Sequence, residues 1–130
     1  MTKTGDTLSK MGGGLLASDG AKDYAVDQYW KNGTRYLRVL RAVARTAGGQ
    51  PIWSTRARLR LPAMKPSETI MFGGSCRKND KSDPFMLAIV TDTGGSVPGD
   101  VKHAWRFDSV SEMLREIATK GISCVNVAGG

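Results

Sequence analysis

The sequence predicts an α+β domain, an antiparallel sheet of about five strands with one main helix packed on it. Three observations favour this class. The 130 residues suit one domain, which we place at residues 21–130. Apolar and charged residues alternate from Trp53 to Leu61, as in a strand. Four apolar residues recur at the helical spacing i, i+3, i+4 and i+7: Val110, Met113, Leu114 and Ile117.

The main helix is predicted over residues 109–118. Ser109, with Glu112 three residues later, has the spacing of a capping box, in which each residue satisfies a free backbone amide of the first turn. Gly121 supplies a stop signal after the last apolar position.

The amino-terminal third is predicted to be mostly irregular. Residues 1–20 contain three consecutive glycines and few large apolar side chains, so we expect a flexible segment. Asp19 or Asp23 could cap a short helix that ends near Asn32-Gly33. Residues 35–44 fit both a helical stripe and a strand, and we favour the strand because a turn signal follows at residues 47–51.

The remaining strands follow from apolar runs and turn residues. The alternation after the turn puts Trp53, Thr55, Ala57, Leu59 and Leu61 on one face of a hairpin strand, opposite three arginines. The run from Phe85 to Val90 predicts a buried central strand. Three further strands are expected at residues 69–76, 103–107 and 122–125, and loops at residues 76–83 and 94–99.

Positive charge is concentrated in one segment. The net charge is +7, yet residues 35–65 hold eight cations and no acid. Arginine suits bidentate contact with carboxylate or phosphate, so this hairpin is a candidate anion-binding surface. The residues proposed to bind the anion are Arg56, Arg58, Arg60, Arg38 and Arg41, with Trp53 and Tyr36 as candidates for stacking. A solvated face that protects an edge strand is the alternative.

Cys76 and Cys124 are the two cysteines of the chain. A disulfide between them would suit an exported protein, periplasmic or secreted. Two buried thiols in a cytoplasmic protein are the alternative. No run of about 20 apolar residues is present, so we expect no membrane-spanning helix.

Catalytic and metal-binding patterns are weak. His103 is the one histidine, no metal-ligand spacing or nucleophile motif surrounds it, and we interpret it as a structural or surface residue. Asp80 and Asp83 lie in a lysine-containing loop that lacks a calcium pattern. Glu112 and Glu116 are explained by helix capping and pairing. We therefore predict no catalytic residue, no metal, no cofactor and no enzyme activity.

Gly48-Gly49-Gln50 matches the tripeptide with which class I peptide-release factors hydrolyse peptidyl-tRNA. Those factors have a longer G-x-G-G-Q loop, whereas Gln50 here runs directly into Pro51-Ile52-Trp53. A hairpin turn is the simpler interpretation, because Gly-Gly suits a turn that needs positive φ.

Seven short motifs occur in order along residues 30–127: Gly33-Thr34-Arg35-Tyr36-Leu37, Gly49-Gln50-Pro51-Ile52-Trp53, Leu59-Arg60-Leu61-Pro62, Gly74-Ser75-Cys76, Asp83-Pro84, Ala104-Trp105-Arg106 and Cys124-Val125-Asn126. In these motifs the chain resembles uncharacterised small exported proteins of proteobacteria. The resemblance implies export and a disulfide, and it implies no activity.

These patterns lead to three hypotheses of function. The first is a monomeric, non-catalytic exported binding protein whose arginine-rich hairpin contacts an anionic macromolecule or protein. The second is a cytoplasmic nucleic-acid-binding protein, for which the Gly-Gly-Gln tripeptide is the added signal. The third is a protein inhibitor of a secreted enzyme.

Overall fold

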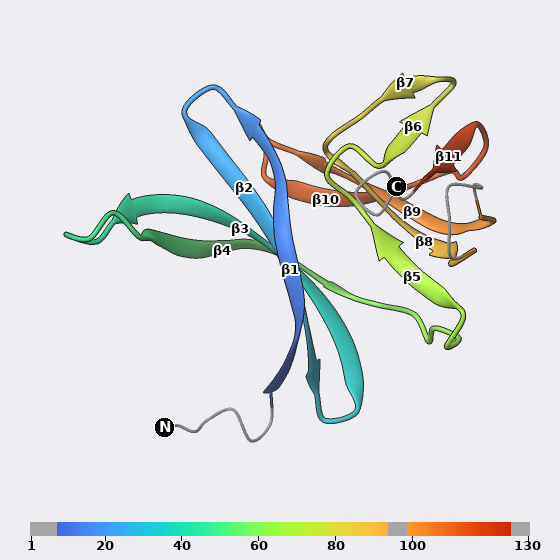
Figure 1. Ribbon diagram of the computed structural model, residues 1–130, viewed down its shortest axis with the longest axis horizontal. Coiled ribbons are helices and arrows are strands. Elements are labelled where there is room, and N and C mark those ends of the chain that lie inside the picture. Colours follow the sequence, from blue (N-terminus) through green and yellow to red (C-terminus); the bar gives the residue numbers. More distant parts are fainter. Residues whose placement is uncertain (1–7, 94–98, 126–130) are drawn as a thin grey trace. The chain divides into compact units, whose positions relative to one another are not determined.

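The computed structural model describes residues 8–93 and 99–125, which form two compact units over Met1–Ala63 and Met64–Gly130 (Figure 1). The described residues contain eleven strands and no helix, and all strand pairs are antiparallel. The predicted α+β class is therefore wrong, because the described part of the chain is all-β. One domain over residues 21–130 stays a prediction. No helix in the described residues is long and apolar enough to cross a membrane.

The first unit is a four-stranded meander in the order β1-β2-β3-β4. Its strands are β1 (Leu8–Asp19), β2 (Lys22–Lys31), β3 (Thr34–Arg45) and β4 (Pro51–Arg60). The strand favoured for residues 35–44 is confirmed as β3, and the turn expected at residues 47–51 joins it to β4. Residues 8–19, expected to be flexible, form β1, whereas residues 1–7 lie outside the described part.

The short helix expected before Asn32-Gly33 is wrong, because both of its ends are hairpin turns. Asn32 and Gly33 both have positive φ, at 51° and 80°, the type I′ geometry that matches the twist of paired strands. At the other end Gly20, with φ of 61°, leads the two-residue loop between Asp19 and Lys22. The segment between two such turns is the strand β2.

One face of this sheet is closely packed. Tyr24 and Val26 of β2 lie beside Leu37 and Val39 of β3, and all four side chains are at most 2% exposed. The opposite face is more open and carries the candidate site.

The second unit contains two small sheets. The larger has the order β10-β9-β8-β5, with β5 (Glu68–Met71), β8 (Met86–Thr91), β9 (Val101–Asp108) and β10 (Met113–Ile117). The smaller has the order β11-β6-β7, with β6 (Cys76–Lys78), β7 (Lys81–Ser82) and β11 (Ile122–Cys124). The buried central strand is confirmed as β8, since Met86 to Val90 are all buried between two neighbouring strands. Of the loop expected at residues 94–99, residues 94–98 lie outside the described part.

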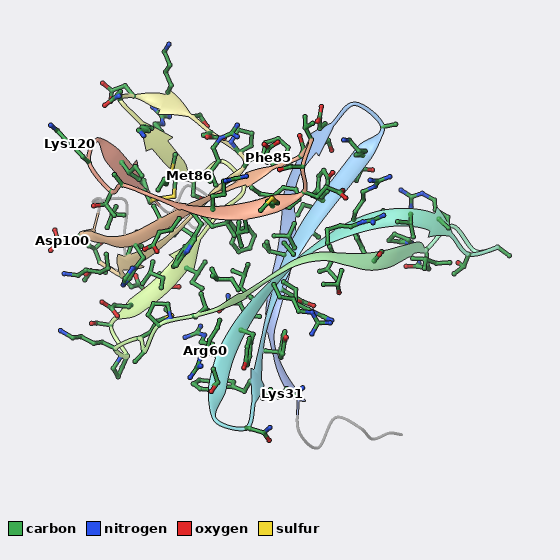
Figure 2. All side chains as sticks on the ribbon, turned by 180° about the vertical axis from the view of Figure 1, so that it is seen from behind. Lys31, Arg60, Phe85, Met86, Asp100 and Lys120 are labelled. Atoms are coloured by element: carbon green, nitrogen blue, oxygen red, sulfur yellow. A yellow bond between two sulfur atoms is a disulfide. The ribbon has the colours of Figure 1, made fainter. Side chains whose placement is uncertain are left out.

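The predicted disulfide is confirmed. Cys76 and Cys124 are directly opposite each other on β6 and β11, their Cα atoms 4.0 Å apart and their sulfur atoms bonded at 2.11 Å. Both cysteines belong to a buried cluster with Met86, Ala88 and Ala104 of the larger sheet (Figure 2). Closing a loop of 48 residues stabilises the folded chain by about 4 kcal/mol in the chain-entropy model.

The predicted helix over residues 109–118 is the main error in the fold, because these residues form the turn and second strand of the β9–β10 hairpin. The backbone amide of Glu112 donates to the carbonyl of Asp108, which closes a single helix-like turn. Glu112 then adopts a left-handed φ of 57°, and the chain reverses into β10. Val110 is 87% exposed and Met113 49% exposed, so the apolar stripe does not exist as a packed face.

Candidate anion-binding face

The open face of the first sheet is built by register around the Asn32-Gly33 turn. On β2 and β3 it carries two directly opposed pairs, Asp27 with Arg38 and Tyr29 with Tyr36. On β4, Arg58 lies opposite Arg38 and Arg60 opposite Tyr36. We call the surface formed by Asp27, Tyr29, Tyr36, Arg38, Trp53, Thr55, Arg58 and Arg60 the arginine face.

A β-bulge at Arg56 decides which residues of β4 reach this face. Ala57 pairs with Val39 but Thr55 pairs with Leu40, so Arg56 is the extra residue in β4. The bulge breaks the alternation, and Trp53 and Thr55 therefore lie on the same face as Arg58 and Arg60. The prediction that Trp53 lies opposite the arginines is wrong, because simple period-two counting assumes an unbroken ladder.

Arg38 is already neutralised. Its Nε and Nη2 atoms donate to the two carboxylate oxygens of Asp27, at 2.8 Å and 2.5 Å. The Asp27 side chain is only 6% exposed, and the guanidinium carbon of Arg38 lies 5.3 Å from the centre of the Tyr29 ring. Hydrogen bonding to Asp27 raises the pKa of Arg38 above its ordinary value. The two charges of this pair cancel, so Asp27 and Arg38 contribute little to the net charge of the arginine face.

Arg58 and Arg60 are the available cations of the arginine face. Both residues are exposed, and within the described part of the chain neither forms an ion pair. Arg58 has one long hydrogen bond, 3.4 Å from its Nη1 to the Tyr29 hydroxyl, and Arg60 extends from the end of β4 (Figure 2). Two guanidinium groups at alternate positions of one strand give this face two positive charges, on the strand next to the stacked tyrosine pair.

The two stacking candidates have different surroundings. Tyr36 is stacked on Tyr29, with ring centres 5.3 Å apart and planes 13° from parallel, so one side of its ring is already covered. Trp53 is 37% exposed and lines an open hollow of about 500 Å³ together with Leu15, Thr55 and the Asp27–Arg38 pair. The hollow has an ion pair at its base and apolar side chains at its edge, which suits an amphipathic group better than a lone ion.

The other two arginines proposed for the site are separated from this face. Arg41 pairs with Ser54 and lies on the packed face with Tyr24. Arg56 is the half-buried bulge residue. Arg35 is likewise on the packed face, where its Nε and Nη2 atoms donate to Gln28 at 3.1 Å and 2.7 Å, and burial lowers its pKa. The structure therefore places five of the predicted residues on one face of the sheet: Arg38, Arg58, Arg60, Tyr36 and Trp53.

Asp27 and Tyr29 were missed by sequence reasoning. Both belong to a segment expected to be helical, so their positions across from β3 were not considered. The signal was the Asn32-Gly33 turn, because residues equally far from a two-residue turn lie opposite each other in the hairpin. Counting outward from that turn pairs Asp27 with Arg38 and Tyr29 with Tyr36.

The remaining motifs have local structural roles. Gly48-Gly49-Gln50 forms the β3–β4 turn, where Gly49 has a φ of 85° and its amide donates to the Thr46 carbonyl. Asn79 and Asp80 form a two-residue turn with φ of 50° and 67°, and Asp83 accepts a hydrogen bond from Arg106 Nε at 2.8 Å. His103 stacks on Trp105 and lies 3.3 Å from Glu116. Among the described residues no three histidine, cysteine or acidic side chains cluster as metal ligands would.

No protein-family model, curated protein or solved structure matches this chain.

Proposed function

We propose that this chain is a non-catalytic, exported binding protein that holds an anionic partner on the arginine face of its first sheet. The observation that carries the proposal is the pair Arg58 and Arg60, exposed side by side and without an acidic partner among the described residues. The Cys76–Cys124 disulfide supports residence in an oxidising compartment, periplasmic or extracellular.

The charge of the arginine face favours an anionic ligand. Asp27, the one acidic residue of the arginine face, is occupied by Arg38. No acid occurs in the sequence between Asp27 and Glu68, so no neighbouring carboxylate in the chain segment competes for Arg58 and Arg60. Carboxylate, phosphate and sulfate groups are the anions that a guanidinium binds through paired hydrogen bonds.

The test is charge reversal at the two arginines. We expect Arg58→Glu/Arg60→Glu to abolish retention on an immobilised dextran sulfate column at low salt, because two attractive charges become repulsive. The wild-type protein should be retained at low salt and should elute as added salt screens its exposed charges. The thermal midpoint should change little, since both side chains are exposed.

The matched control is Lys78→Glu/Lys81→Glu, which makes the same change in net charge on exposed residues of the β6–β7 hairpin. Equal loss of retention in both variants would show that the polyanion senses only net charge, and the proposal would fail. Preferential retention on single-stranded DNA over dextran sulfate would favour the nucleic-acid hypothesis instead.

A further inference from the structure

The β3–β4 hairpin extends beyond the four-stranded part of its sheet. The pairing of β2 with β3 ends at Tyr24 with Arg41, whereas β3 and β4 continue to pair from Ala42 to Arg45 and from Pro51 to Trp53. Figure 1 shows this end of the hairpin diverging from the β1–β2 hairpin. We call residues 42–53 the arm. A two-stranded ribbon with no third strand and no core is marginally stable in water, so the arm gains from contact with another surface.

The arm exposes apolar side chains. Val43 is 47% exposed, Ile52 44% and Trp53 37%, and residues 43–50 are exposed without exception. Leu15, 73% exposed, lines the same hollow as Trp53. Ile52 and Trp53 are successive residues of β4, so the arm exposes apolar side chains on both faces of its ribbon. Exposed apolar side chains gathered on one short hairpin favour an interaction site.

The charge of the arm is entirely positive. Arg45 lies at the start of its turn, where its Nη1 donates to the carbonyl of Gly49 at 3.0 Å. Arg41 directly precedes the arm, and the acid-free segment from Gln28 to Ser67 contains it completely. The arm thus combines a cation beside its turn with exposed apolar side chains further along its two strands and no acid. Basic and apolar side chains in one acid-free segment favour contact with the interface of an anionic bilayer.

We propose that the arm inserts Ile52 and Trp53 into the headgroup region of an anionic lipid bilayer while Arg45, Arg58 and Arg60 contact the lipid phosphates. This inference rests on the proposed function and names its partner. Tryptophan favours the boundary between water and acyl chains, and aliphatic side chains gain by leaving water there. A nucleic acid would contact the arginines but would gain little from the exposed aliphatic side chains of Val43 and Ile52. A lipid surface can contact both kinds of side chain, so we favour it as the partner.

The experiment uses the full chain and vesicles of defined composition. We expect the wild-type protein to sediment with vesicles containing about one third phosphatidylglycerol and to remain in solution with pure phosphatidylcholine, because charge brings the arm to the surface. Ile52→Ser/Trp53→Ser should lower the partition coefficient at least about tenfold. In a Trp30→Phe background, the emission of the wild-type Trp53 should shift to shorter wavelength on binding, since the buried Trp105 contributes a constant signal.

The matched control is Val110→Ser/Met113→Ser, which removes two exposed apolar side chains from the β9–β10 hairpin. It should bind vesicles as the wild type does. Val43→Ser is a milder variant of the arm, and unchanged thermal midpoints in all three proteins show that each is folded. Wild-type partitioning of the Ile52→Ser/Trp53→Ser variant would overturn the inference.

The two proposals fail in different ways. Charge-dependent retention on dextran sulfate without binding to either vesicle would overturn the lipid inference and leave the anion-binding face intact. Preferential binding of an oligonucleotide or an acidic protein over vesicles would have the same meaning. If the wild-type protein neither is retained on dextran sulfate nor binds vesicles, the proposed function itself fails.

Discussion

The arginine face shows how the same residue type takes different roles according to its partner. Arg38 is held by Asp27, Arg35 by Gln28, and Arg58 and Arg60 project into solvent. The sequence predicts the segment and its sign, because eight cations without an acid are visible in the letters alone. It does not predict which arginines are occupied, because that depends on cross-strand register and on the bulge at Arg56.

The Asp27–Arg38 pair gives a prediction at this scale. Asp27→Asn should lower the free energy of unfolding by about 2–3 kcal/mol, because it leaves the partly buried Arg38 without its carboxylate. The freed guanidinium should also raise the salt concentration needed to elute the protein from dextran sulfate. Urea unfolding and column elution measure the two effects.

Asp27→Asn/Arg38→Gln is the control for this pair. It should return the elution salt to the wild-type value, and the double-mutant cycle isolates the coupling of the two side chains. Independent, additive effects of the two substitutions on stability would contradict the role given to this pair.

At the scale of elements, the β9–β10 hairpin explains why the fold class was mispredicted. Residues 109–112 begin as a capped helical turn does, but the cap is Asp108, whose Oδ1 accepts hydrogen bonds from the amides of Val110 and Ser111. A turn of this kind continues as a helix only if the next residues bury an apolar face. Met113 to Ile117 pair instead with β9. The spacing of apolar residues along the sequence does not reveal this strand pairing, which overrides local helix propensity.

The strands that sequence reasoning placed well are those with local signals. The apolar run of β8 has the composition of a buried strand, and the Gly48-Gly49 turn joins two alternating segments. In contrast, β1 is rich in glycine and was expected to be flexible. Its pairing with β2 supplies the order that its own composition does not.

Asp108 gives a pH prediction for the β9–β10 hairpin. Hydrogen bonds from the Val110 and Ser111 amides hold the pKa of Asp108 below its ordinary value. A depressed folded-state pKa stabilises the protein above the unfolded value of about 3.9, and this contribution is lost as pH falls through the lower folded value. Asp108→Asn keeps the acceptor but removes the charge, so its unfolding free energy should fall less than that of the wild type between pH 5 and 2, as measured by urea unfolding. Identical pH profiles would show that the charge does not contribute.

At the scale of the whole molecule, the candidate binding surfaces and the disulfide lie in different units. The first unit carries the arginine face and the arm, and its described residues contain no cysteine. The second unit carries the disulfide, which joins β6 to β11 and packs into the core of that unit. The disulfide could be predicted by counting cysteines. The division near residue 63 was missed, although the acid-free basic segment ends close to it, at residue 65.

The most direct test of the account is the location of the bound anion. Amide and arginine Nε–H resonances of the uniformly ¹⁵N-labelled protein would be followed while a short dextran sulfate is added at low salt. If the anion binds the arginine face, the resonances of the Arg58 and Arg60 side chains and of the β4 amides should shift progressively, while those of the β6–β7 hairpin stay unchanged. Shifts confined to that hairpin, or spread evenly over all exposed cations of both units, would contradict it.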